Sequence, residues 1–163
     1  MLLLIVLKIN FLHAQDNYDT IPPYQKDSSH LPSFTVIQTD STYINDKKIP
    51  SDKPVVIVYF SPTCGHCQIT AQEFGERMKD MKDIYFVWVT YSHPLAEIDE
   101  FAKKFNLRQF TNVMIGRLTD YSLPSYYRIK FTPYMALYNK QHRLVQTWGQ
   151  GTEADTIIKL LKD

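Results

Sequence analysis

Residues 55–60 are the feature that most restricts the fold of this chain. They read Val-Val-Ile-Val-Tyr-Phe, a continuous run of β-branched and aromatic side chains. Such a run is typical of a strand that is buried on both faces of a sheet. The run stops at Ser61-Pro62-Thr63, and from Cys64 to Met81 apolar residues recur at helical spacing. The sequence therefore predicts a central strand, followed at once by a helix that begins near Cys64.

A second strand and helix follow the first pair. Residues 84–90 form another apolar run, and residues 95–105 place apolar side chains on one helix face with charges on the other. The order strand, helix, strand, helix predicts parallel pairing through right-handed crossovers. We expect a further short strand within 112–118 and a short helix within 122–129.

Shorter strands and a last helix complete the predicted domain. Residues 33–49 alternate in short bursts that predict two strands, an N-terminal extension of the sheet. Residues 133–138 and 144–148 predict an antiparallel hairpin. Thr152 is expected to cap a final amphipathic helix. The fold class is therefore α/β, with a central mixed β-sheet flanked by helices on both faces.

Length, charge and cysteine content exclude several classes of protein. The 163 residues suit a single domain, and 18 basic against 17 acidic residues leave a net charge of +1. Because the chain has no strong positive charge, we expect no binding to nucleic acid. Two cysteines are too few for a disulfide-rich scaffold, which needs several bridges.

The N-terminal region predicts a secreted protein. Residues 1–12 are almost entirely apolar and lead into a polar stretch. A membrane-spanning helix needs about 20 apolar residues, so we expect a secretory signal peptide over residues 1–15 and no stable membrane span. Residues 16–32 are polar and predict a linker, which leaves 33–163 as the domain. The mature protein is expected to work in an extracytoplasmic, oxidising space, either periplasmic or secreted.

The two cysteines lie at the predicted start of the helix, in Cys64-Gly65-His66-Cys67. The N–H groups and the dipole at a helix N-terminus stabilise an anion, so we expect Cys64 to have a lowered pKa and to attack as a thiolate. Cys67, about one turn later, can attack a mixed disulfide formed on Cys64. Gly65 is expected to permit the tight turn into the helix, and His66 to tune the redox potential.

Other interpretations of the cysteine pair are weaker. A structural disulfide between them would close a very small loop and gain little entropy. Zinc needs four ligands, and the chain has no second cysteine pair to supply them. The alternative function is a binding module without turnover, which holds copper through two thiols and one histidine or binds a partner peptide. His93, beside Pro94, is interpreted as a loop residue.

The segments VYFSPTCGHCQ and FTPYMALYN, together with the order of the elements, resemble a thioredoxin-fold thiol-disulfide oxidoreductase of the TlpA/ResA-like extracytoplasmic branch. The resemblance covers roughly residues 34–162. It implies a thioredoxin-like monomer that exchanges disulfides with protein substrates and an upstream redox partner, without a cofactor or metal. It also implies that Pro133 is a cis-proline facing the cysteines, and that Thr132 offers backbone groups to an extended substrate segment.

Two positions depart from the family pattern. Thr63 stands where many members carry Trp before the first cysteine, and Val58 stands where thioredoxins carry a buried acid that moves protons for the second. Proton transfer is then left to Glu73 or to water. The direction of electron flow stays open. ResA-like proteins suggest reduction, whereas the Gly-His dipeptide, like that of protein disulfide isomerases, suggests oxidation or isomerisation.

Overall fold

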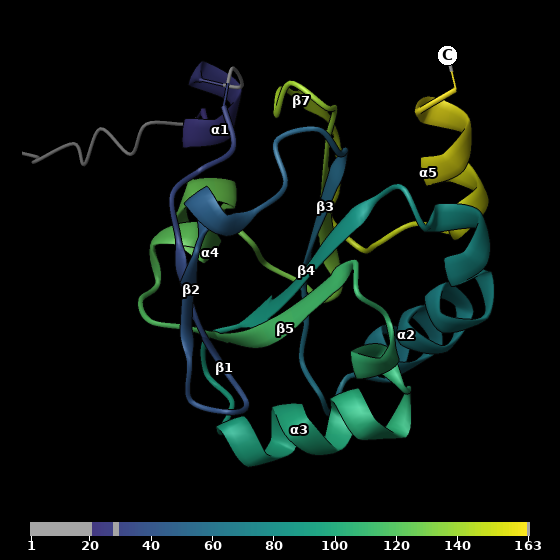
Figure 1. Ribbon diagram of the computed structural model, residues 1–163. Coiled ribbons are helices and arrows are strands. Elements are labelled where there is room, and N and C mark those ends of the chain that lie inside the picture. Colours follow the sequence, from purple (N-terminus) through teal and green to yellow (C-terminus); the bar gives the residue numbers. More distant parts are fainter. Residues whose placement is uncertain (1–20, 28–29, 163) are drawn as a thin grey trace, which may run out of the picture.

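Seven strands form one sheet in the order β2-β1-β5-β4-β3-β6-β7 (Figure 1). The computed structural model describes residues 21–27 and 30–162, so the signal peptide predicted for residues 1–15 lies outside the described residues. The strands are β1 (Thr35–Gln38), β2 (Tyr43–Asn45), β3 (Val55–Tyr59), β4 (Tyr85–Thr90), β5 (Val113–Leu118), β6 (Tyr134–Tyr138) and β7 (Leu144–Trp148).

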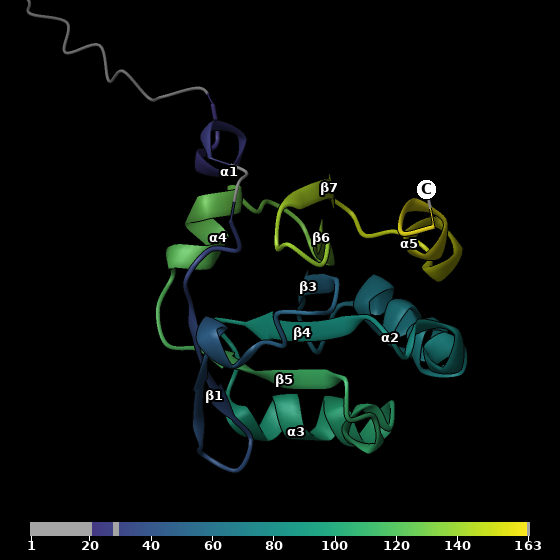
Figure 2. The same ribbon diagram turned by 45° about the horizontal axis from the view of Figure 1, so that its top comes forward.

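Helices cover both faces of this sheet, as predicted. Helices α2, α3 and α5 pack on one face, and α4 packs on the other with α1 beside it (Figure 2). The α-helices are α1 (Pro23–Lys26), α2 (Gly65–Arg77), α3 (Leu95–Lys104), α4 (Ser122–Tyr127) and α5 (Ala154–Leu160), and the 3₁₀ helices are η1 (Asp46–Lys48), η2 (Met78–Met81) and η3 (Leu107–Gln109). The predicted polar linker, residues 16–32, contains α1, whose Tyr24 ring packs on Tyr127 of α4.

The sheet is mixed, and its pairing follows the sequence prediction. Strand β3 pairs with β4 in parallel, and β4 with β5 in parallel, which confirms the crossover connections. Strands β6 and β7 form the predicted antiparallel hairpin, and β1 and β2 form the N-terminal β extension. Because β3 also pairs with β6, it is an interior strand.

Strand β3 supplies side chains to two separate cores. Val56 and Val58 belong to the cluster under α2, α3 and α5, whereas Val55 and Ile57 belong to the cluster on the α4 side. All four side chains are fully buried. Successive side chains of a strand point to opposite faces, so a strand covered on both faces needs an unbroken apolar run.

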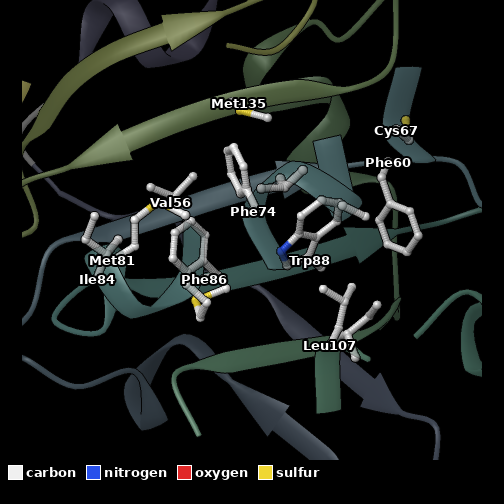
Figure 3. Close-up of a cluster of buried hydrophobic side chains, with 14 of the residues drawn as sticks. Val56, Phe60, Cys67, Phe74, Met81, Ile84, Phe86, Trp88, Leu107 and Met135 are labelled. Carbon is white, nitrogen blue, oxygen red and sulfur yellow. The ribbon is translucent and has the colours of Figure 1, made fainter. Parts of the chain in front are cut away.

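Aromatic rings organise the cluster that lies under α2. The Trp88 ring contacts Phe60 and Phe74 edge to face, at centroid distances of 5.6 and 6.1 Å. Such pairs contribute about 0.5–1.5 kcal/mol each beyond the area they bury. Cys67 lies at one end of the cluster, near Phe60 (Figure 3). The first turn of α2 is thereby anchored in the core.

The N-terminus of α5 is capped differently from the prediction. The helix begins at Ala154 with Glu153 at the N-cap position, so the prediction that Thr152 caps it is wrong. The side chain of Glu153 makes no capping hydrogen bond. Instead, Glu73 of α2 accepts a hydrogen bond from the Ala154 N–H through its Oε1 at 2.8 Å. A carboxylate from a neighbouring helix therefore satisfies an N–H that sequence alone assigns to a local cap.

At Gly116, strand β5 lies too close to β1 for a side chain. A Cβ atom at this position would lie 2.4 Å from the carbonyl oxygen of Ile37 and 2.5 Å from Cγ1 of Val36. Both groups belong to β1, and a backbone oxygen cannot move without disturbing the strand pairing. The attachment of the β1–β2 hairpin therefore requires a glycine here.

We predict that Gly116→Ala destabilises the protein by about 2 kcal/mol, since overpacking in a well-packed interior typically has this cost. Urea unfolding of the full chain measures the change. Gly149→Ala is the matched control, because a Cβ there would meet no atom within 4 Å. Equal unfolding midpoints for the two variants would contradict the close approach of β1 to β5.

Candidate functional site

The two cysteines lie where the chain leaves β3 and enters α2. Cys64 is the N-cap residue of α2, and its N–H donates to the carbonyl oxygen of Ser61 at 3.1 Å. Both cysteines are free thiols; Cys64 is partly exposed, and Cys67 is fully buried. The predicted helix start near Cys64 is therefore confirmed, and the pair presents one accessible and one protected sulfur.

The pKa of Cys64 is set by opposing influences. Partial burial is the largest single influence and raises it, but hydrogen bonds from Thr132, Cys67 and His66 together outweigh burial. The net result is a pKa below the usual value for a thiol. Hydrogen bonds to the thiolate stabilise the charged form, as expected at the first turn of a helix. Cys64 therefore has the character of an attacking thiolate.

Cys67, in contrast, is buried and has a raised pKa. Burial is the largest cause that raises the pKa of its thiol, a backbone hydrogen bond from Ser61 lowers it, and the neighbouring Cys64 also raises it; the net pKa is about 12. At neutral pH Cys67 is therefore protonated, and it needs a proton acceptor before it can act as a nucleophile. The contributions from Cys64 require its free sulfur, so they change once Cys64 is bound in a mixed disulfide.

Thr132 and Pro133 lie against the cysteine pair, although 68 residues separate Thr132 from Cys64. The thiol of Cys64 donates to the carbonyl oxygen of Thr132 at 3.3 Å. The Thr132–Pro133 peptide is cis, in agreement with the family resemblance. Thr132 is half-buried and Pro133 is buried, directly before β6. The structure thus brings together the cysteines and the Thr-Pro pair.

Gly151 supports Pro133 and was not identified from the sequence. Its φ of +78° lies in the left-handed region, and a Cβ there would meet Cγ of Pro133 at 2.8 Å. The loop between β7 and α5 therefore packs on the Thr-Pro pair only because residue 151 is a glycine. Glycine between a strand and a helix is typical of an ordinary turn, so the local sequence does not indicate this contact.

Gly65 and His66 lie on the exposed side of the site. A Cβ at Gly65 would meet no atom within 4 Å, and its φ is not left-handed. The turn into the helix therefore leaves room for a side chain at this position. The exposed His66 lines a groove of about 540 Å³ between α2 and the loop that contains Gly151. The redox-tuning roles of both residues stay predictions.

Glu73, the proton acceptor suggested by the sequence, is hydrogen-bonded to another helix. Glu73 is half-buried, and its carboxylate caps α5 through the Ala154 N–H. Val58, at the position of the buried acid in thioredoxins, is fully buried in the apolar cluster that includes Cys67. Neither residue is arranged to accept a proton from Cys67.

A hydrogen-bonded chain of side chains adjoins the site instead. The Ser61 hydroxyl lies 3.1 Å from Oγ1 of Thr63 and 3.0 Å from Nε2 of His93. On the other side of the ring, Nδ1 of His93 lies 2.8 Å from Oε2 of Glu97. His93 does lie in the loop after β4, as predicted, but it also contacts the segment that leads into Cys64. The only sequence signal was the spacing of His93 and Glu97, four residues apart at the start of a helix.

Two further properties concern the described part of the chain. Among residues 21–27 and 30–162, no helix is long and apolar enough to cross a membrane. The same residues contain no group of three or more His, Cys, Asp or Glu side chains that could hold a metal ion.

Comparison with known families identifies the fold family. The sequence pattern of the thioredoxin family matches residues 34–119, which is more than half of the chain. The chain belongs to the thioredoxin family. The matched region contains both cysteines, and Thr132 and Pro133 follow it, directly before β6. No curated protein sequence matches the chain.

Solved structures share this fold at low sequence identity. A secreted Mycobacterium tuberculosis disulfide oxidoreductase, described as homologous to DsbE of E. coli, is 17% identical with a TM-score of 0.62 over 78% of this chain and 92% of that chain. The exposed lipoprotein thioredoxin of Streptococcus pneumoniae is 20% identical, with a TM-score of 0.59 over 80% and 98%. A thiol:disulfide interchange protein of Chlorobium tepidum is 13% identical, with a TM-score of 0.61 over 88% and 97%.

We predict that iodoacetamide modifies Cys64 on the order of 100-fold faster than Cys67 at pH 7, because only thiolates react and Cys67 is both buried and protonated. Mass spectrometry of the single-thiol variants Cys67→Ser and Cys64→Ser measures the two rates. The Cys64 rate is expected to level off below the usual thiol pKa, whereas the Cys67 rate keeps rising above it. Similar rates and pH profiles for both sulfurs would contradict this difference.

Proposed function

We propose that this protein is an extracytoplasmic thiol-disulfide oxidoreductase that exchanges disulfides with protein substrates through Cys64 and Cys67. One observation carries the proposal: an accessible thiol of lowered pKa lies one helical turn from a buried thiol of raised pKa. Thiol-disulfide exchange depends on this difference in exposure and pKa, because one sulfur must attack from solvent and the other must stay unreactive until a mixed disulfide has formed.

The reaction in the reducing direction proceeds in two displacements. The Cys64 thiolate attacks one sulfur of a client disulfide, forms a mixed disulfide and releases the other client sulfur as a thiolate, which takes up a proton. Cys67 then loses its proton and attacks Sγ of Cys64. The Cys64–Cys67 disulfide forms, the bond to the client breaks, and the second client thiolate leaves. The client gains two electrons and the protein loses them; the oxidising direction is the reverse.

The Thr-Pro pair supports docking of a client polypeptide. Thr132 is half-buried, and its carbonyl oxygen already accepts a hydrogen bond from the Cys64 thiol. The preceding Phe131 is 63% exposed, and Ile69 on α2 is 66% exposed. An extended client segment can therefore bind backbone groups at Thr132 while its apolar side chains cover these two residues.

The proposed compartment has separate support. The apolar N-terminal run predicts secretion, and an oxidising space is where protein disulfides form and persist. Among proteins of the same fold, the Mycobacterium tuberculosis protein is described as secreted and the Streptococcus pneumoniae protein as an exposed lipoprotein. In such a space, the protein would depend on an upstream partner to restore the starting redox state of its cysteines.

The reduction potential of the Cys64–Cys67 pair decides the direction of electron flow. Incubation in graded glutathione mixtures, followed by alkylation and mass measurement, determines it. We predict a value of about −180 to −120 mV, in the range of isomerases and oxidants, because the exposed His66 lies between the cysteines and can stabilise the thiolate form. A value near about −270 mV, similar to thioredoxin, would instead assign a reductase.

We predict that Cys67→Ser accumulates covalent complexes with client proteins, because Cys64 still attacks but no thiol resolves the mixed disulfide. The complexes are detected on non-reducing gels of extracytoplasmic extracts and disappear on reduction. Cys64→Ser is the matched control and should form far fewer complexes, since Cys67 is buried. If neither variant traps a protein, the protein does not exchange disulfides with protein substrates, and a binding function without turnover becomes the better assignment.

A further inference from the structure

A hollow of about 370 Å³ lies beside the Thr-Pro pair, between α1, the end of α4 and the β6–β7 hairpin. Its volume is at the lower end of the range for ligand pockets, about 300–1,000 Å³. Phe131 and Tyr134, which flank Thr132 and Pro133 in the sequence, both line it. The hollow therefore begins one residue away from the carbonyl oxygen that accepts a hydrogen bond from the Cys64 thiol.

Aromatic rings form the walls of this hollow. Tyr24 of α1, Tyr127 of α4 and Tyr134 of β6 line it together with Phe131. The ring centroids of Tyr24 and Tyr127 are 5.6 Å apart, and those of Tyr127 and Tyr134 are 5.2 Å apart. Such rings offer a large apolar area against which another ring packs well. Figure 2 shows α1 beside α4, so the segment predicted as a linker contributes one of the walls.

The charged groups of the hollow are basic. Arg128 and Lys130 line it, and no Asp or Glu is among the described residues that do so. Lys130 is exposed, and its ammonium group makes no ion pair or hydrogen bond within residues 21–27 and 30–162. In the same part of the chain, the buried hydroxyl of Tyr134 has no hydrogen-bond partner. A carboxylate is the ligand group that an unpaired ammonium donor favours.

The position of the hollow favours a client polypeptide as its occupant. An extended segment bound at Thr132 advances about 3.3 Å per residue, so side chains a few positions from its cysteine reach past Phe131. Lys130 and Phe131 are both exposed at the rim, which leaves room for side chains that enter from a backbone outside. Aromatic walls beside an unpaired positive charge are complementary to an acidic residue next to an aromatic one.

We propose that the hollow lined by Tyr24, Tyr127, Lys130, Phe131 and Tyr134 binds an acidic residue and an adjacent aromatic residue of the client polypeptide. This inference rests on the proposed disulfide exchange and adds the class of client: segments with an acidic and aromatic pair near the reacting cysteine. The client carboxylate pairs with Lys130, and the client ring packs among the tyrosines. Both contacts lie outside the cysteine pair, so they select the client and leave the chemistry of the sulfurs unchanged.

Peptide disulfides test this specificity separately from the exchange itself. Each peptide has a single cysteine, blocked as a mixed disulfide with thiopyridine, in a Gly-Ser sequence that carries Glu-Tyr, Gln-Tyr, Lys-Tyr or Glu-Gly two positions before or after the cysteine. Attack on the peptide sulfur forms a disulfide with the protein and releases thiopyridone, which is followed by absorbance. Rates of the reduced full-length protein at low peptide concentration are divided by its rate with dipyridyl disulfide, which is uncharged and has no peptide.

At the better of the two placements, the wild-type protein is expected to react about 5-fold faster with the Glu-Tyr peptide than with the Gln-Tyr peptide, the upper range for an exposed ion pair. The Lys-Tyr peptide should react most slowly. Lys130→Gln should bring the three rates together, and Lys130→Glu should reverse their order, because like charges then meet. Tyr24→Ala should reduce the preference for Glu-Tyr over Glu-Gly and keep the preference for Glu over Gln.

Lys140→Glu is the matched control. It makes the same change of charge at an exposed lysine that follows β6, beyond the end of the strand opposite Tyr134, and it should keep the wild-type order of rates. Equal wild-type rates for the Glu, Gln and Lys peptides would overturn the proposed specificity. A wild-type order in Lys130→Glu would overturn it too, since the preference would then arise elsewhere. If the wild-type protein releases thiopyridone from none of the peptides, the proposed disulfide exchange itself is refuted.

Discussion

The burial of β3 on both faces is the constraint on which the site depends. Val56 and Val58 pack toward α2, and Val55 and Ile57 pack toward α4, so the strand cannot bend out of the sheet before it ends. Strand β3 ends at Tyr59, and the next N–H, that of Phe60, still donates to the carbonyl oxygen of Val89 at 3.0 Å. The N–H of Cys64 then bonds the Ser61 carbonyl oxygen and α2 begins. The position of the reactive sulfur is therefore a consequence of where an apolar strand stops.

One helix links the cysteines to the segments that surround them. Helix α2 carries Cys67, which is buried in the aromatic core, and Glu73, which caps α5. The loop before α5 contains Gly151, which packs on Pro133. The cap therefore ties this loop to the same helix that carries the cysteines. Contacts within one layer of helices thus hold the Thr-Pro pair against Cys64.

The parts of the structure that could be predicted from sequence are those governed by local patterns. The unbroken apolar run at residues 55–60 and the helical spacing after Cys64 depend on neighbours a few residues away, so strand, helix and cysteine placement were predictable. The cis-proline was available only from the family resemblance. The contacts of Gly151, the cap of α5 by Glu73 and the hydrogen bonds of His93 join distant segments, and no local periodicity encodes them.

Val58 keeps ionisable groups out of the core position beside Cys67. An ionisable group there would sit in an apolar cluster with Cys67, where desolvation makes a charge costly unless it is paired. A valine avoids that cost and adds to the core. His93 lies at the edge of the site, where its Nδ1 lies 2.8 Å from Oε2 of Glu97 and 21% of its side chain is exposed. The core around Cys67 therefore contributes packing alone.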